Sequence, residues 1–236
     1  MSNLKYTEKQ ILITLSGRTF RGLSSTTSCY VLMATLFALL AYSITVSSAS
    51  KNDYIMKLKK RYNFDTTIHL KFDLNIYWKI REKTEKKQGE LIISPEKKFY
   101  CRIGATQWIS NGITYWQYNK YTSQVIIKNL LDIDISAHPS QMIESYLNYP
   151  YSVKSSKDNE TVLQWLAEEK ELQKKYQKIT LWIDNSKTLL KKIQVMDKNG
   201  NESTYTFKKT RINVQVPENQ FSFKIPKGAD ILDARE

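Results

Sequence analysis

The chain has 236 residues and a formal net charge of +13 at pH 7, because 36 lysines and arginines outnumber 23 aspartates and glutamates. It contains two histidines, His69 and His138, and no Gly-x-Ser-x-Gly, His-Glu-x-x-His or phosphate-loop motif. We expect both histidines at the surface, so the sequence argues against an enzyme and predicts neither a metal site nor a cofactor. The scattered lysines favour a solvated basic surface, with an anionic membrane or an acidic partner as the alternative.

The first 49 residues are typical of an export signal. Residues 30–46 form an apolar run without charge; four basic residues precede it and the small residues 47–50 follow it. We expect cleavage after Ala49 and a single domain over residues 50–236. The run of 17 residues is also close to the length of a membrane span, so a retained N-terminal anchor stays open. Either way the sequence predicts export to the periplasm, where nucleic acid is a poor partner.

The two cysteines lie on either side of the predicted cleavage site. Cys29 precedes the apolar run and Cys101 follows it, so no internal disulfide is possible after cleavage. We expect Cys101 to be a buried apolar side chain. No cysteine stands directly after the apolar run, as a lipoprotein signal would require, so the product is not expected to be lipidated itself.

A short helix and one long strand are predicted next. The segment Asn52 to Tyr62 has a capping residue at its start and apolar residues at helical spacing. From Thr67 to Ile80 apolar and polar residues alternate, which predicts a strand with one apolar face. Strands average about 5–6 residues, so one this long indicates a large antiparallel sheet. The apolar face consists of Ile68, Leu70, Phe72, Leu74, Ile76, Trp78 and Ile80.

Turn residues divide the following segment into hairpins. The charged stretch Arg81 to Lys87 is expected to be a turn or the tip of a hairpin, and Pro95 is expected between two strands. Asn111 and Gly112 predict a type I′ turn, because both residues tolerate a positive φ. Strands are expected over residues 89–93, 98–103, 106–110, 113–118 and 124–128.

The remaining sequence mixes helical and strand patterns. Pro139 to Leu147 has helical spacing with a proline near the first turn. Thr161 to Tyr176 fits either a strand followed by a charged loop or one amphipathic helix, and we prefer a strand over Thr161 to Leu166. Further strands are expected over 179–184, 189–196, 203–209 and 212–216. The total of ten or eleven strands with two or three short helices predicts one mainly antiparallel β domain.

Four motifs resemble those of the LolA family of periplasmic lipoprotein carriers. Their order and spacing agree with the family's pattern across residues 52–233. The resemblance implies a half-open antiparallel β-barrel around a hydrophobic cavity, with the helices as a lid. The motifs are Gly89-Glu90-Leu91, the hairpin Asn111-Gly112-Ile113-Thr114-Tyr115-Trp116-Gln117-Tyr118, the turn Asp197 to Gly200, and Phe221-Ser222-Phe223-Lys224-Ile225-Pro226-Lys227-Gly228.

The resemblance also implies a function and its partners. A member of this family would carry acylated lipoproteins from an inner-membrane ABC-type release complex to an outer-membrane receptor, and we expect it to act as a monomer. A second class of function stays open, namely a periplasmic sensor or adaptor of the same half-barrel fold that binds a lipid or a protein.

One departure from the family's pattern concerns the lid. Many members place an arginine directly before the proline of the second strand, where it helps to hold the lid closed, whereas Ser94 precedes Pro95 here. Arg102, further along the same hairpin, or a lysine at 97 or 98 is a candidate replacement. The lid and gating candidates are Pro95, Arg102, Met142, Ile143 and Tyr146.

A carrier of acyl chains needs a broad apolar cavity, because each methylene removed from water contributes about 0.8 kcal/mol. For every candidate residue the alternative is ordinary core packing. The residues predicted to line the cavity lie at alternating or motif-matched strand positions. They are Ile68, Leu70, Phe72, Leu74, Ile76, Trp78, Leu91, Ile93, Phe99, Trp116, Trp182, Phe221 and Phe223.

Overall fold

The structure is a computed structural model that describes residues 53–133, 141–168 and 170–235. The predicted signal segment and His138 lie outside these residues. Twelve strands are present: β1 (Ile68–Trp78), β2 (Lys83–Ser94), β3 (Lys98–Ile103), β4 (Thr106–Asn111), β5 (Thr114–Asn119), β6 (Gln124–Asn129), β7 (Tyr151–Lys157), β8 (Glu160–Trp165), β9 (Tyr176–Asp184), β10 (Leu189–Asp197), β11 (Glu202–Ile212) and β12 (Asp230–Asp233).

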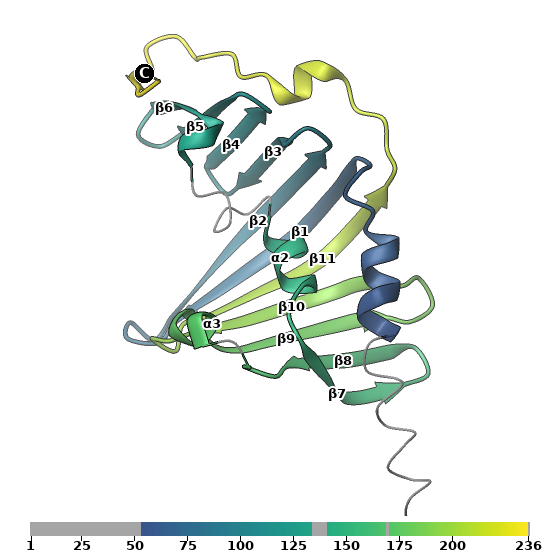
Figure 1. Ribbon diagram of the computed structural model, residues 1–236. Helices are drawn as coiled ribbons and strands as arrows, with labels where there is room; N and C mark the ends of the chain where they lie inside the picture. The colour runs from purple at the N-terminus through teal and green to yellow at the C-terminus, as the bar shows by residue number, and fades with distance from the viewer. Residues whose placement is uncertain (1–52, 134–140, 169, 236) are drawn as a thin grey trace, which may run out of the picture. The chain divides into compact units, whose positions relative to one another are not determined.

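All twelve strands belong to one open sheet. Their order is β12-β6-β5-β4-β3-β2-β1-β11-β10-β9-β8-β7, and the two outermost strands do not pair with each other. Neighbouring strands are antiparallel except β12, which runs parallel to β6. The sheet curves, and the helices lie on its concave side (Figure 1). The predicted mainly antiparallel, half-open architecture is confirmed, with twelve strands instead of ten or eleven.

Three α-helices occur in the described part of the chain, namely a helix over residues 53–61, α2 (Met142–Leu147) and α3 (Lys170–Lys175). Two short 3-10 helices, η1 (Leu130–Asp132) and η3 (Glu218–Phe221), also lie in the described residues. None of the described helices is both long and apolar enough to cross a membrane. The predicted first helix is confirmed over its described residues, and the second begins at Met142, since Pro139 lies outside them.

The long strand β1 defines two faces of the sheet. Its residues Ile68, Leu70, Phe72 and Leu74 are buried on one face, which we call the inner face. The opposite side is the outer face. The predicted alternation is therefore confirmed, but the strand ends at Trp78. A tight turn follows, in which Glu82 has a positive φ, and Ile80 is 88% exposed.

The register of the sheet extends the inner face to both sides of β1. On one side Leu70 pairs with Leu91 and, in turn, Leu91 pairs with Cys101. On the other side Leu74 pairs with Tyr205, which pairs with Ile193. Because residues directly opposite each other share a face, the inner face is a continuous apolar wall from β3 to β8.

Two turn predictions are correct only in part. Arg81 and Glu82 lie in the tip of the β1–β2 hairpin, as predicted, but Lys83 to Lys87 already belong to β2, because the hairpin arms are exposed there and tolerate charge. Asn111 and Gly112 do join two strands, but Gly112 alone has a positive φ, of 94°. The Asn111 side-chain oxygen instead accepts hydrogen bonds from the N–H groups of Ile113 and Thr114, at 3.0 and 2.8 Å, and forms an Asx-type turn.

The remaining differences concern polar or short segments. Thr161 to Leu166 is a strand as preferred, namely β8, and the charged residues after it form α3. Residues 212–216 do not form a separate strand, since β11 continues to Ile212 and ends there. Strands β7 and β12 were not predicted, because neither has an alternating apolar pattern.

Candidate functional site

The inner face is the candidate site, and it brings together eight of the thirteen predicted cavity residues. They come from three neighbouring strands, and their register places all of them on this face. The eight are Ile68, Leu70, Phe72, Leu74, Ile76, Leu91, Ile93 and Phe99. Seven of them are buried, and Ile76 is half-buried. Trp78 also points to this side, but it lies at the end of β1 opposite Lys83 and outside the main apolar cluster.

Cys101 lies within this wall. Its side chain is fully buried between those of the neighbouring strands, and burial raises the pKa of the thiol to about 12. The thiol is therefore protonated and behaves as a small apolar side chain, as predicted.

The helix over residues 53–61 covers one end of the wall. Leu58 and Tyr62 are fully buried in the same cluster as the strand residues. The Tyr62 hydroxyl accepts a hydrogen bond from the backbone N–H of Leu190 at 3.1 Å. Burial raises the pKa of Tyr62 to about 12, so the phenol stays neutral. This helix is thereby fastened to β10.

The short helix α2 covers the middle of the wall. Ile143 and Leu147 are buried against it, and the Tyr146 ring lies 6.1 Å from Tyr149 and 6.3 Å from Tyr176 in edge-on contacts. The Tyr151 hydroxyl donates a hydrogen bond to the Tyr146 carbonyl at 2.8 Å. Two lid candidates, Ile143 and Tyr146, thus lie in this cover. A third, Met142, is the first residue of α2, and its side chain lies outside the described part.

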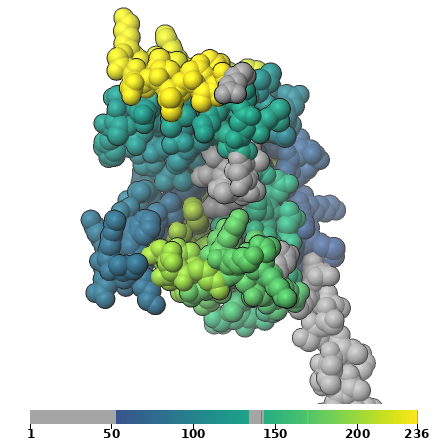
Figure 2. Space-filling model, turned by 60° about the vertical axis from the view of Figure 1, so that its left-hand side comes forward, coloured from purple at the N-terminus to yellow at the C-terminus, as the bar shows by residue number. Residues whose placement is uncertain are grey.

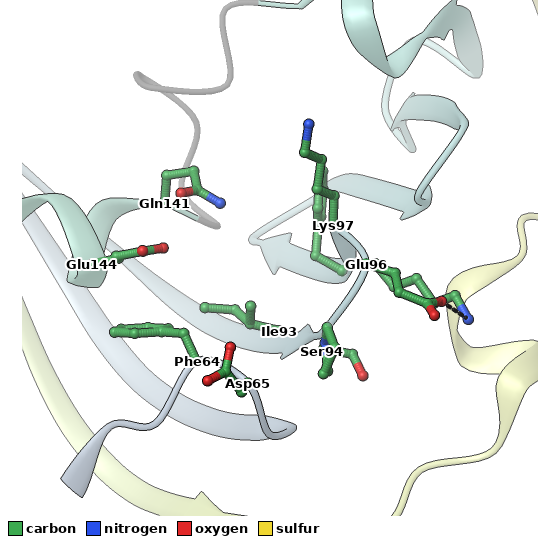
Figure 3. Close-up of a pocket in the computed structure, with 11 residues that line it drawn as sticks. Phe64, Asp65, Ile93, Ser94, Glu96, Lys97, Gln141 and Glu144 are labelled. Carbon is green, nitrogen blue, oxygen red and sulfur yellow. Dashed lines mark ion pairs between the residues drawn. The ribbon is translucent and has the colours of Figure 1, made fainter. Parts of the chain in front are cut away.

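A pocket of about 260 Å³ opens between α2 and the β2–β3 turn. Figure 3 shows its lining, in which Ile93 and Phe64 lie near the carboxylates of Asp65 and Glu144. Pro95, one of the predicted lid candidates, belongs to the same lining. The pocket therefore combines an apolar floor with a polar rim at the edge of the covered wall.

Arg102 was a wrong choice as a lid-holding residue. Its guanidinium lies on the outer face, where Nη2 is 3.5 Å from Oε2 of Glu90, so the sheet separates it from α2. The Ser94 hydroxyl is 2.8 Å from that of Thr67, so this side chain is paired with the segment before β1. In the described part of the chain, α2 is held by apolar and aromatic contacts and by the hydrogen bond from Tyr151.

Glu90 is the centre of a charged cluster on the outer face. Its carboxylate lies 2.8 Å from His69 and 3.4 Å from Lys71, besides Arg102. Burial alone would raise the pKa of Glu90, but the hydrogen bond from His69 and the charge of Lys71 outweigh it and lower the pKa below the ordinary 4.5.

Replacing Glu90 with glutamine should reduce the change in the free energy of unfolding between pH 7 and pH 3. A carboxylate with a lowered folded-state pKa stabilises the fold above its unfolded pKa, and this contribution is lost as the pH falls through the folded value. We therefore expect E90Q to be less stable than the parent at pH 7 and to approach it near pH 3, as measured by urea unfolding. Equal differences at both pH values would contradict the assignment, and E168Q, which changes an exposed glutamate, is the control.

Four predicted cavity residues lie on the opposite side of the sheet. Trp116 and Trp182 point to the outer face, where Lys192 Nζ lies 3.5 Å above the Trp182 ring. Phe223 packs at 5.5 Å against Tyr118, which also points outward. Phe221 is buried in η3, which contacts β3 and β4 from that side. These choices were wrong because alternation identifies residues that share a face but not which face is covered.

Sequence reasoning missed the half of the wall contributed by β8 to β11. Its signal was present in the alternation of Ile179, Leu181 and Ile183 in β9. Tyr205 and Phe207 of β11 were not predicted as part of the wall either. The centroids of their rings lie 5.7 and 6.2 Å from that of Phe72. With these residues the apolar wall is about twice as wide as the predicted stripe.

The chain is similar to several known proteins. The family model "Outer membrane lipoprotein carrier protein LolA" matches residues 44–224. An outer-membrane lipoprotein carrier protein from Wigglesworthia glossinidia brevipalpis is 29% identical over 214 residues, which cover 85% of this chain and 94% of that protein. The corresponding protein from Chromobacterium violaceum is 26% identical over 155 residues, 64% of this chain and 74% of that protein. A LolA superfamily protein from Nitrosomonas europaea has a solved structure with 12% identity and a TM-score of 0.41, covering 73% of this chain and 97% of that chain.

Proposed function

Since this chain belongs to the LolA family of outer membrane lipoprotein carrier proteins, we propose that it binds the acyl chains of lipoproteins on its inner face and carries them between membranes. The predicted export signal supports a periplasmic location. The proposed partners are acylated lipoproteins, an inner-membrane ABC-type release complex and an outer-membrane receptor. No catalytic role is proposed.

The observation that carries the proposal is the way in which the apolar wall is covered. A wall from β3 to β8 faces helices instead of a second sheet, and α2 has six residues. So short a helix has little stability of its own and depends on its packing. An acyl chain of about 16 carbons would gain roughly 12 kcal/mol from complete burial, at about 0.8 kcal/mol per methylene. That is enough to compete with the side chains of α2 for the wall.

The proposal predicts that release of a lipoprotein depends on the inner face. Inner-membrane vesicles containing an active release complex and a lipoprotein are incubated with the protein, and the soluble fraction is assayed for a 1:1 complex. We expect release by the parent protein and strongly reduced release by I76E, because a carboxylate on the wall opposes acyl binding. The matched control is Y77E, the next residue of β1, which points to the outer face and is 40% exposed.

Two outcomes would count against a carrier. Absence of any soluble lipoprotein despite an active release complex would favour a sensor or adaptor, and equal loss in I76E and Y77E would show that the inner face is not the site. Thermal unfolding of both variants verifies that each is folded.

A further inference from the structure

The turn of the β1–β2 hairpin carries an exposed apolar tip between cations. Ile80 is 88% exposed. Lys79 and Arg81 flank it, Lys83 follows at the start of β2, and all three are exposed. In the described part of the chain none of these cations forms an ion pair, whereas Lys87, further along β2, is paired with Glu85 at 3.1 Å. The turn contains one acidic residue, Glu82.

Two neighbouring segments bring further cations to the same place. The Lys79 N–H donates a hydrogen bond to Oδ1 of Asn201 in the β10–β11 turn, at 3.1 Å. The Lys198 N–H of that turn donates to the carbonyl of Lys175 at the end of α3, at 3.2 Å. Figure 1 shows these segments at one end of the sheet, and in Figure 2 the blue hairpin projects on the left beside the yellow-green turn. We call residues 79–83 with Lys175 and Lys198 the hairpin end.

The hairpin end also contains a recess. A pocket of about 360 Å³ is lined by Trp78, Ile80, Arg81, Asn199 and Asn201. It combines an indole and an aliphatic side chain with a guanidinium and two amides. This combination suits the interface of a bilayer, where acyl chains, carbonyls and phosphates lie within a few ångströms of one another.

The chemistry distinguishes a membrane from other partners. A single exposed isoleucine is ordinary on a protein surface, and scattered lysines are ordinary as well. An apolar tip surrounded by unpaired cations fits an anionic bilayer. Each lysine or arginine near such a surface increases the binding constant by about fivefold. An acidic protein would satisfy the cations and leave Ile80 without a defined contact.

We propose that the hairpin end docks on bilayers that contain anionic phospholipids, with Ile80 entering the interface and Lys79, Arg81 and Lys83 next to the phosphates. This inference does not depend on the proposed carriage of acyl chains. The pocket beside Ile93 lies at the other end of β1, whose 11 residues span roughly 30 Å. A docked protein therefore keeps that pocket free for another partner.

The test uses the protein purified from the periplasm of an expressing bacterium, in the form that the cell produces. Sedimentation with vesicles of phosphatidylcholine, with or without 30% phosphatidylglycerol, measures binding. We expect binding to anionic vesicles, weakened by salt, about fivefold loss in I80S and tenfold or greater loss in the triple variant K79S/R81S/K83S. Controls are I113S, an isoleucine 75% exposed in the β4–β5 turn, and K59S/K60S/R61S, which removes the same charge from an exposed helix surface.

A second measurement covers the case in which the N-terminal segment itself binds vesicles. Amide hydrogen exchange of residues 78–83 should slow on anionic vesicles and stay unchanged on neutral ones. Equal losses in the hairpin and control variants, or exchange at 78–83 that anionic vesicles leave unchanged, would overturn the proposal. Binding to an acidic protein but to no vesicle would also overturn it.

Discussion

Truncating Ile143 and Tyr146 to alanine together should raise the affinity of the protein for an apolar probe, such as a fluorescent fatty acid, by about tenfold or more. Both side chains pack α2 on the inner face, so in the proposed carrier the probe binds only molecules in which α2 is displaced. The apparent affinity is then the intrinsic affinity multiplied by that fraction. A loss of about 1.4 kcal/mol of α2 packing is enough for a tenfold change, and two buried truncations should exceed it. Titration of probe fluorescence measures the effect.

The matched control for this experiment is the double variant I113A/Y121A. It removes the same two types of side chain from exposed turns of the β4–β5 and β5–β6 hairpins, and we expect unchanged affinity. If the α2 variant remains folded but binds the probe no better than the parent, α2 is a fixed part of the core and not a displaceable cover.

Replacing Phe72 with alanine should lower the free energy of unfolding by about 3–5 kcal/mol. Phe72 is buried at the centre of the wall, and its ring packs against Tyr205 and Phe207. It also covers Gly89, where any β-carbon would collide with the ring. A domain of this kind is stable by about 5–15 kcal/mol in total, so the loss is a large share. Urea unfolding followed by circular dichroism measures it.

The control for Phe72 is F223A, the same chemical change on the outer face. Phe223 is half-buried and packs mainly against Tyr118, so its truncation should have less than half the effect. An equal or larger effect of F223A would mean that the segment after η3, and not the inner face, contains the principal core of the fold.

Much of the fold was predictable because β1 has such a regular alternation. Ile68 to Leu74 identified the buried face of the longest predicted strand. Pro95 and Gly112 marked two turns between successive strands, namely the β2–β3 turn and the β4–β5 turn. The motif glycine at position 89 has a physical reason that the sequence alone did not reveal, since the Phe72 ring lies against its backbone.

The errors in the candidate site have one physical origin. Trp116 and Trp182 are large and lie on true strands, but a strand buries one face only, and the side that is covered depends on its register with β1. A shift of one residue reverses every side chain. Following the cross-strand pairing through the successive hairpins from β1 to β5 would have placed Tyr115, and not Trp116, on the inner face. The position of Phe221 and Phe223 had no such signal, because no predicted pairing connects them to the sheet.

The polar strands were unpredictable for a different reason. β7 contains Ser155, Ser156 and Lys157 and is mostly exposed, so hydrophobic patterning had little to detect. β12 depends on a parallel pairing with β6 that local sequence does not specify.

These two inconspicuous strands have a consequence for solubility. An open sheet presents a row of unpaired backbone groups at each lateral edge, and long apolar edges invite strand addition between molecules. Here one edge is the four-residue β12, with Asp230 and Asp233 at its ends. The other is β7, with Lys154 and Lys157. Charge at both edges and the short length of β12 disfavour strand addition between molecules, so the sheet can have a wide apolar wall without offering an apolar edge for pairing.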